Sequence, residues 1–311
     1  MDPWIVFLVF LYSTIFLFGF TGNLTMVLVT IFSRNLRSSC NILIGACCFF
    51  DLILFTDILA FIYSIFVDTP QDVCFYINIP ADFGAFASNA CVLMVGIDRL
   101  LAITNPQKYK FIEINKKKYL TILLSFPIAY ASILLWIGFG QRNPEKTVIC
   151  LLPESLGHAY DLFAMTSFII NLFVPPIYIY VYLKIKKVQM KASTQSVFKS
   201  LFITVILVVS GWMTTDLCGV LSVVIPMPAN IARYIQLYCG AFIFTSSSLN
   251  AFVYYKISKD YRLAIRLLFG WDKPGNRWMK STVGNQPMID GSTHQRKETN
   301  SKSIHPTPSR F

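Results

Sequence analysis

Charged residues are scarce in this chain. Asp, Glu, Lys and Arg make up 14% of its 311 residues, while hydrophobic residues make up 55%. A soluble domain carries about a quarter of its residues as charges, so this composition excludes an ordinary soluble protein. The net charge of +11 does not by itself indicate nucleic acid, because its meaning depends on where the charges lie along the chain. We expect no nucleic-acid partner.

Histidine is also scarce. The chain has three, His158, His294 and His305, and none lies in an apolar stretch. A hydrolase inside a membrane would need paired catalytic carboxylates or a metal cluster. The candidate acids are spread over three apolar stretches: Asp51, Asp57, Asp82 and Asp216. We therefore expect no enzymatic activity and no metal centre.

Long apolar stretches are abundant, and a window of about 19 residues separates seven of them. Each is long enough to cross a bilayer as a helix, and none has the ten-residue alternation of a β-barrel strand. The first is too long for a signal peptide and no basic residue precedes it, so we expect it to remain in the protein. The predicted spans of this all-α membrane protein are Ile5–Phe32, Cys40–Phe66, Phe75–Thr104, Tyr119–Phe139, Leu162–Leu183, Val197–Ile225 and Tyr234–Tyr255.

Basic residues lie mostly on one side of these spans. If the N-terminus is outside, the outer loops contain only Arg142, Lys146 and Arg233 of the 27 Lys and Arg residues. Cytoplasmic segments carry the basic excess in membrane proteins, so the pattern predicts an outer N-terminus and an inner tail.

Two segments follow the seventh span. Residues 256–269 alternate basic and apolar side chains and predict an amphipathic helix on the inner leaflet. Residues 270–311 are rich in Pro, Gly, Ser, Thr and Asn, which predicts a disordered cytoplasmic tail. The expected domains are therefore a seven-span domain over 1–269 and the tail over 270–311.

The segment from Cys74 to Tyr109 has the most informative spacing. Cys74 and Arg99 lie 25 positions apart, which is about 37 Å along a helix. The bilayer core is about 30 Å thick, so a helix puts the cysteine at one face and the Asp98-Arg99 pair at the other. Pro106 follows Arg99 seven positions later and Tyr109 ten positions later.

Only two of the eight cysteines, Cys74 and Cys150, lie in predicted outer segments, where oxidation is possible. A disulfide between them would tie the third span to the loop between the fourth and fifth spans. Two unrelated free thiols are the alternative. The other six lie within or at the ends of the spans: Cys40, Cys47, Cys48, Cys91, Cys218 and Cys239.

Polar residues inside the spans need internal partners. A carboxylate at the depth of Asp51 costs at least about 2.5–3.5 kcal/mol, and an unsatisfied amide at Asn23 is also costly. Both should face the interior of the bundle, and Asp51 is a functional candidate. A neutral carboxyl that serves packing alone is the alternative.

Taken together, these residues resemble the rhodopsin-like G-protein-coupled receptors over about residues 15 to 269. Two segments are similar to the nematode serpentine receptor class SX family of chemoreceptors. They are Gly-Ile-Asp-Arg-Leu-Leu-Ala-Ile and the segment from Asn250 to Arg262. Two prolines of the wider family are replaced, by Thr214 and Ala251. The motifs that carry the resemblance occur in the expected order: Gly22-Asn23, Asp51, Cys74, Asp98-Arg99, Cys150, Trp212 and Asn250-x-x-x-Tyr254.

The resemblance implies a mechanism. A small-molecule or peptide ligand binds between the outer halves of the helices, the sixth helix swings outward below Trp212, and a heterotrimeric G protein docks at the inner face. It implies a plasma-membrane receptor, with the sensory cilium as a specific location and arrestin at the phosphorylated tail as a further partner. The implied switch residues are Asp98, Arg99, Pro106, Tyr109 and Tyr254.

A sodium-type cluster is also implied, with no other cofactor. Its carboxylate, hydroxyl and amide oxygens suit a hard cation, although buried hydroxyls often only hydrogen-bond a carboxylate. The matching residues are Asn23, Asp51, Ser88, Ser246 and Asn250.

The ligand pocket is predicted from two acids. Amine receptors carry Asp seven residues after the cysteine of the third helix, where this chain has Ala81, with Asp82 next to it. Neither Asp82 nor Asp216 has a Lys or Arg in its own span. Each acid is therefore either neutral, by taking up a proton and bonding to Tyr or Thr, or charged and able to bind a cationic ligand. We expect a neutral or cationic ligand. The predicted pocket residues are Asp82, Trp212, Thr215 and Asp216.

Other functions fit less well. A retinal protein needs a lysine in the seventh span, and Tyr234–Tyr255 has none. A transporter or channel built from repeats would show two related halves, and seven spans do not divide evenly. A neuropeptide or amine receptor of the same superfamily is the main alternative to a chemoreceptor.

Overall fold

The computed structural model describes residues 3–187, 192–225 and 228–272. The predicted tail lies outside these residues from residue 273 onward. The described part is almost entirely helical, with two short strands, β1 (Thr69–Pro70) and β2 (Thr147–Val148), paired antiparallel. The helices are α1 (Pro3–Phe32), η1 (Arg34–Leu36), α2 (Ser39–Leu54), α3 (Thr56–Phe66), α4 (Gln71–Thr104), α5 (Pro106–Ile114), α6 (Lys116–Phe139), α7 (Leu152–Leu156), α8 (Ala159–Lys187), α9 (Ala192–Val224), α10 (Ala229–Ser248), α11 (Asn250–Ile257) and α12 (Lys259–Leu268).

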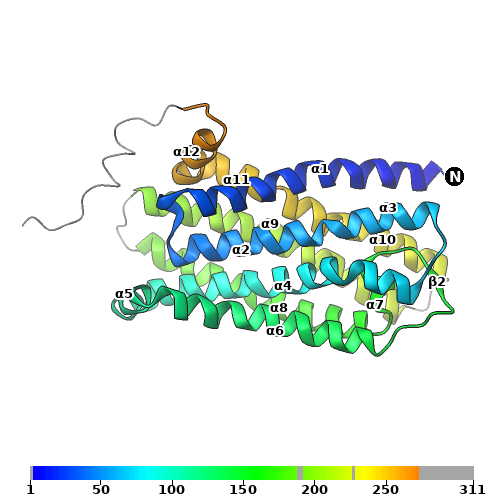
Figure 1. The fold of residues 1–311 in the computed structure, drawn as a ribbon. Coiled ribbons are helices and arrows are strands. Elements are labelled where there is room, and N and C mark those ends of the chain that lie inside the picture. Colours follow the sequence, from blue (N-terminus) through cyan, green and yellow to red (C-terminus); the bar gives the residue numbers. More distant parts are fainter. Residues whose placement is uncertain (1–2, 188–191, 226–227, 273–311) are drawn as a thin grey trace, which may run out of the picture. The chain divides into compact units, whose positions relative to one another are not determined.

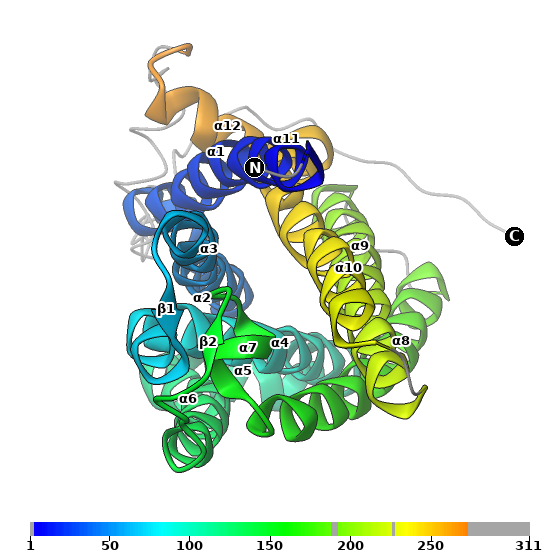
Figure 2. The ribbon, with the colours of Figure 1, turned by 90° about the vertical axis from the view of Figure 1, so that its right-hand side faces the viewer.

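The long helices form a bundle, and the protein is a multi-pass membrane protein. Within the described residues, six spans are long and apolar enough to cross a bilayer, which confirms the first six predicted spans. The seventh corresponds to α10 and α11, which pack against α9 and α1. Figure 1 shows two ends of the bundle, a loop end with α7 and β2 and an opposite end with α5. Figure 2 shows the long helices arranged in a ring when the bundle is viewed from the loop end.

The seventh helix is interrupted without a proline. Ala251 replaces the expected proline, yet α10 ends at Ser248 and α11 begins at Asn250. The hydroxyls of Ser246 and Ser248 donate to backbone carbonyls of the preceding turn, and the N–H of Leu249 is shared between two carbonyls, both at 3.3 Å. Such local bonds compete with the helix pattern and allow the break. In contrast, α9 continues through Thr214.

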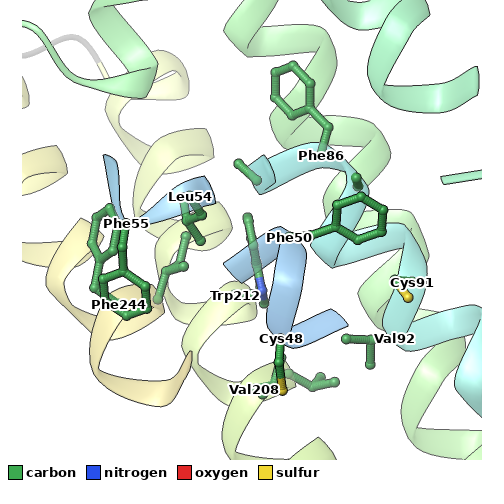
Figure 3. Packing of buried hydrophobic residues seen from close by; sticks show 14 of the residues in the cluster. Cys48, Phe50, Leu54, Phe55, Phe86, Cys91, Val92, Val208, Trp212 and Phe244 are labelled. Atoms are coloured by element: carbon green, nitrogen blue, oxygen red, sulfur yellow. The ribbon is translucent and has the colours of Figure 1, made fainter. Parts of the chain in front are cut away.

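The interior of the bundle combines aromatic and polar side chains, while much of its exterior is apolar. The rings of Phe163 and Trp212 meet edge to face with centroids 6.0 Å apart, and Phe86 lies 4.5 Å from Phe163. Figure 3 shows Trp212 among side chains of neighbouring helices. Phe10 and Phe18 of α1 are more than two-thirds exposed. In a lipid environment, apolar side chains can face the lipid, whereas acidic side chains must face the interior of the bundle.

One loop is fixed to the loop end of the bundle. Cys74 at the start of α4 forms the predicted disulfide with Cys150, with their Cα atoms 5.4 Å apart. Beside it, β1 pairs with β2, and α7 follows two residues after the cysteine. The loop therefore lies against α4 and reaches the space between the helices.

A close approach between α2 and α4 depends on Gly84. A Cβ at this position would lie 2.6 Å from the backbone nitrogen of Leu54 and 2.7 Å from the carbonyl oxygen of Phe50. Backbone atoms cannot move aside cheaply, so the two helices must separate to admit a methyl group.

We expect Gly84→Ala to lower the free energy of unfolding by about 1–3 kcal/mol, the usual cost of overpacking. The thermal unfolding midpoint of the purified protein measures this effect. Gly140→Ala is the matched control, because a Cβ there meets only an ordinary contact at 3.5 Å. Equal midpoints for the two variants would contradict the close packing.

Candidate functional site

A cavity lies at the loop end of the bundle, lined by α1, α2, α3, α8, α9, α10 and the loop that carries α7. Loop residues Ile149 to Glu154 contribute part of its wall. Its aromatic lining comes from four helices: Tyr12, Tyr160, Phe163, Trp212 and Phe244. An apolar cavity with a few convergent polar groups is the usual form of a small-ligand site.

Three acids reach this cavity, and none of the described residues that line it is Lys or Arg. Asp216 of α9 accepts hydrogen bonds from Ser167 at 2.8 Å and from Asn171 at 3.3 Å, both on α8. Asp57 of α3 accepts one from Asn78 of α4. The third acid, Glu154, has its carboxylate 3.0 Å from the ammonium group of Lys146. The cavity is therefore acidic overall.

The structure changes two members of the predicted pocket. Trp212 and Asp216 line the cavity as predicted, but Asp82 and Thr215 do not. Asp82 is fully buried and accepts a 3.0 Å hydrogen bond from Ser155, because α7 lies over it. Thr215 is turned toward backbone carbonyls of Gly211 and Cys239. Asp57 lines the cavity where Asp82 was expected to do so. The position of Asp57 inside a predicted span could have suggested that it lines the cavity.

A polar cluster centred on Asp51 lies midway along the bundle. Its carboxylate accepts hydrogen bonds from Ser88 at 2.5 Å, from Asn250 at 3.0 Å and from Ser247 at 3.5 Å. Asn23 donates to the carbonyl oxygen of Ser247. These contacts join α1, α2, α4, α10 and α11 at one level of the bundle.

Ser247 replaces Ser246 in this cluster. The hydroxyl of Ser246 donates to the carbonyl of Ile243 and its side chain faces Gly211 of α9. One residue is about 100° around a helix, so the two serines cannot both face Asp51. Ser246 was predicted from the family resemblance, which does not account for the helix interruption at Leu249.

The carboxylate of Asp98 organises the opposite end of the bundle. It is fully buried, pairs with Arg99, and accepts hydrogen bonds from the hydroxyls of Tyr109 and Tyr119, each at 3.1 Å. The guanidinium of Arg99 also donates to Tyr109. Burial raises the pKa of Tyr109, so its hydroxyl stays protonated.

Two members of this group were not predicted. Tyr119 begins the fourth span and reaches Asp98 from α6. Glu113 lies 3.2 Å from the hydroxyl of Tyr109 and accepts a 3.1 Å hydrogen bond from the backbone N–H of Ser39, at the start of α2. No spacing within the sequence indicated these contacts, which depend on how α5 folds back.

The remaining predicted switch residues have structural positions of their own. Pro106 occupies the first turn of α5. Backbone N–H groups in the first turn have no partner within the helix, so the missing N–H of proline costs no hydrogen bond there. Tyr254 is buried in α11 and its ring centroid lies 4.9 Å from that of Tyr261 in α12. Tyr254 therefore links the seventh helix to α12.

A second disulfide was not predicted. Cys218 of α9 and Cys239 of α10 are joined, with their Cα atoms 6.5 Å apart. Both cysteines fall inside predicted spans, and no partner was predicted for either. The described free cysteines are Cys40, Cys47, Cys48 and Cys91.

The disulfide between Cys74 and Cys150 can be tested directly. Cys74→Ser should lower the free energy of unfolding by about 2–5 kcal/mol and impair delivery to the cell surface. Surface labelling and thermal unfolding measure these effects. Cys47→Ser, at a free and partly buried thiol, is the control and should have little effect. Thiol mapping that finds Cys74 and Cys150 both reduced in the mature protein would refute the bridge.

Comparison with known proteins agrees with this geometry. The family model described as "Serpentine type 7TM GPCR chemoreceptor Srsx" matches residues 16–269. Among characterised proteins, growth hormone secretagogue receptor type 1 of Mus musculus is 22% identical over 311 residues, covering 86% of this chain and 85% of the relative. The Rattus norvegicus and Oryctolagus cuniculus receptors are 21% and 22% identical, with the same coverage.

Proposed function

This chain belongs to the Srsx family of seven-transmembrane G-protein-coupled chemoreceptors, and we propose that it detects a neutral or cationic chemical in the cavity at its loop end. Members of the family and the similar mammalian proteins are receptors rather than enzymes. The observation that carries the proposal is the acidic, aromatic cavity above Trp212.

The proposal places the loop end outside the cell and the α5 end inside. Disulfides form on the oxidising side of a membrane, and the Cys74–Cys150 bridge lies at the loop end. In this orientation α12 lies on the inner leaflet, with Tyr261, Ala264 and Ile265 packed inward. Basic residues of the described connections gather at the α5 end: Arg34, Arg37, Lys108, Lys110 and Lys116. The plasma membrane, and the sensory cilium in particular, is the proposed location.

The ligand class follows from the charges of the cavity. Asp57 and Asp216 are each at most 2% exposed and are held by uncharged donors only. A cationic ligand gains a charge-assisted contact with either acid and stacks on the aromatic walls. A carboxylate ligand would be repelled, because no described basic residue lines the cavity.

The switch follows from the Asp98 group. In the resting state, Arg99 is held by the adjacent carboxylate and by Tyr109, so it is not presented to a G protein. A ligand that favours a different packing around Trp212 shifts the population toward a state in which α9 moves and Arg99 is released. Arrestin at the phosphorylated tail belongs to the same scheme.

A sodium ion beside Asp51 is also part of the proposal. The site offers a carboxylate, the hydroxyls of Ser88 and Ser247, and the buried Oδ1 of Asn23, which makes no hydrogen bond. These oxygens are ligands that suit a hard monovalent cation. An ion here would reinforce the resting arrangement of the helices that meet at Asp51.

A peptide signal is the second candidate ligand. The similar mammalian proteins carry the name of a receptor for a growth hormone secretagogue. The protonated amino terminus of a peptide would satisfy the same acids as a free amine. Ligand screening separates the two candidates.

The switch makes a paired prediction. Asp98→Asn should raise basal signalling several-fold, because Arg99 loses its charged partner. Arg99→Ala should abolish G-protein activation while ligand binding is retained. A G-protein activation assay in cells, normalised to surface expression, measures both. Normal signalling by Arg99→Ala would show that the proposed mechanism is wrong at its centre.

The ligand class is tested by screening volatile acids, amines and amidated peptides against cells that express the receptor. Asp216→Asn should weaken a cationic agonist about tenfold or more, the equivalent of one charge-assisted hydrogen bond. Glu145→Gln, at an exposed loop acid outside the cavity, is the control and should leave potency unchanged. A potent organic-acid agonist that acts equally on wild type, Asp57→Asn and Asp216→Asn would contradict the proposal.

A further inference from the structure

A second group of buried polar side chains lies at the loop end, apart from the Asp51 cluster, and one of its members also lines the cavity. It comprises Asp57 of α3, Asn78 and Asp82 of α4, and Ser155 of α7, and each is at most 1% exposed. Figure 2 shows α7 lying against α4 at the loop end. Asn78 and Asp82 are four residues apart on one helix, so their side chains share a face.

The contacts within this group connect three elements. Asn78 donates to Oδ1 of Asp57 at 3.1 Å, and the backbone N–H of Leu152 donates to the same carboxylate. Ser155 donates to Oδ2 of Asp82 at 3.0 Å. Asp57 bonds to Asn78, which shares a face of α4 with Asp82, so the two carboxyl groups lie on the same side of α4. Two buried carboxyl groups are thus brought together beneath the loop.

The hydrogen bonds leave this group incomplete. Oδ1 of Asp82 and Oδ1 of Asn78 are buried and have no hydrogen-bond donor. Within the described part of the chain, neither Asp57 nor Asp82 forms an ion pair with Lys, Arg or His. Unpartnered acceptors beside two buried carboxyl groups favour a bound positive charge, because a buried acceptor without a donor destabilises the fold.

We propose that Asp57, Asn78, Asp82 and Ser155 bind a hard divalent cation from outside the cell, with Ca²⁺ as the best match. The group offers oxygen ligands from two carboxylates, one amide and one hydroxyl, and no thiolate or imidazole, which selects Ca²⁺ over transition metals. No three Asp, Glu, His or Cys side chains come together as a metal site among residues 3–187, 192–225 and 228–272, so a cation here would need amide, hydroxyl and water oxygens beside the two carboxyl groups. Asp57 also lines the cavity, which supplies an entry path.

The bound cation would hold the loop to the bundle. It joins α3 and α4 to α7, and the residues from Leu151 to Glu154 on the same loop line the cavity. A loop that the cation has already fixed loses less conformational entropy when a ligand binds. Cation binding and ligand binding are therefore coupled, and each strengthens the other by the same factor.

The test uses the purified full-length protein in nanodiscs of neutral lipid, which do not themselves concentrate Ca²⁺. After chelation, CaCl₂ is added at constant ionic strength through the range of about 10⁻⁴–10⁻³ M that is typical of extracellular calcium modules. We expect the thermal unfolding midpoint to rise with Ca²⁺ concentration and to rise less with Mg²⁺. Neither ligand nor G protein is needed, so the outcome is independent of the proposed function.

Two matched variants locate the ion. Asp82→Asn should weaken the Ca²⁺ response at least tenfold, whereas Asp216→Asn, which removes a different buried acid, should keep it. An equal response in both variants would place the ion elsewhere and overturn the proposal. If Asp82→Asn does not fold, Asn78→Ala replaces it, and Tb³⁺ luminescence displaced by Ca²⁺ reports binding in the wild type. A wild-type protein that mild acid stabilises but Ca²⁺ does not would show that protons neutralise the pair, which also refutes the cation site.

Discussion

The cost of burying a carboxylate inside a bundle surrounded by lipid is the constraint on which this structure depends. In lipid, helices gain little from hydrophobic contact with one another, so packing and polar contacts hold them together. Each buried acid must find a donor, and in every case at least one donor comes from another element. The acids are Asp51, Asp57, Asp82, Asp98 and Asp216, and their partners lie on α4, α5, α6, α7, α8, α10 and α11.

In the proposed mechanism, the same contacts make the bundle responsive. A ligand, an ion or a proton takes the place of a donor that satisfies a carboxylate, and the packing of the helices that meet there changes. Asp216 lies one turn from Trp212 and bonds to α8, so a ligand that engages it acts on α8 and α9 together. At the other end, Asp98 joins α4 to α5 and α6.

Much of the fold could be predicted from the sequence. The first six spans follow from hydropathy, and the Cys74–Cys150 disulfide follows from the position of two cysteines beyond those spans. The ion pair between Asp98 and Arg99 could be predicted because the two residues are adjacent in the sequence and lie near the end of a helix. These features depend on composition and local spacing, which a single sequence contains.

The errors arose where distant segments meet. Asp82 was predicted to line the cavity because it lies in the outer half of its span with no basic residue there, but the sequence does not reveal that α7 covers it. Ser246 was predicted from the family resemblance, but its hydroxyl bonds within its own helix and Ser247 faces Asp51 instead. The role of Tyr119 depends on the path of α5, which no periodicity indicates. Each error comes from a tertiary contact rather than from a wrong helix.

The central claim is that hydrogen bonds to Asp98 restrain the receptor in its inactive state. The most direct measurement is guanine-nucleotide exchange on purified heterotrimeric G proteins, catalysed by the receptor in nanodiscs without ligand. Tyr119→Phe removes one hydroxyl from Asp98 and leaves the ion pair intact. The account predicts exchange several-fold above wild type for Tyr119→Phe, and none once Arg99→Ala is added. Equal exchange by wild type, Tyr119→Phe and the double variant, with all three folded, would contradict it.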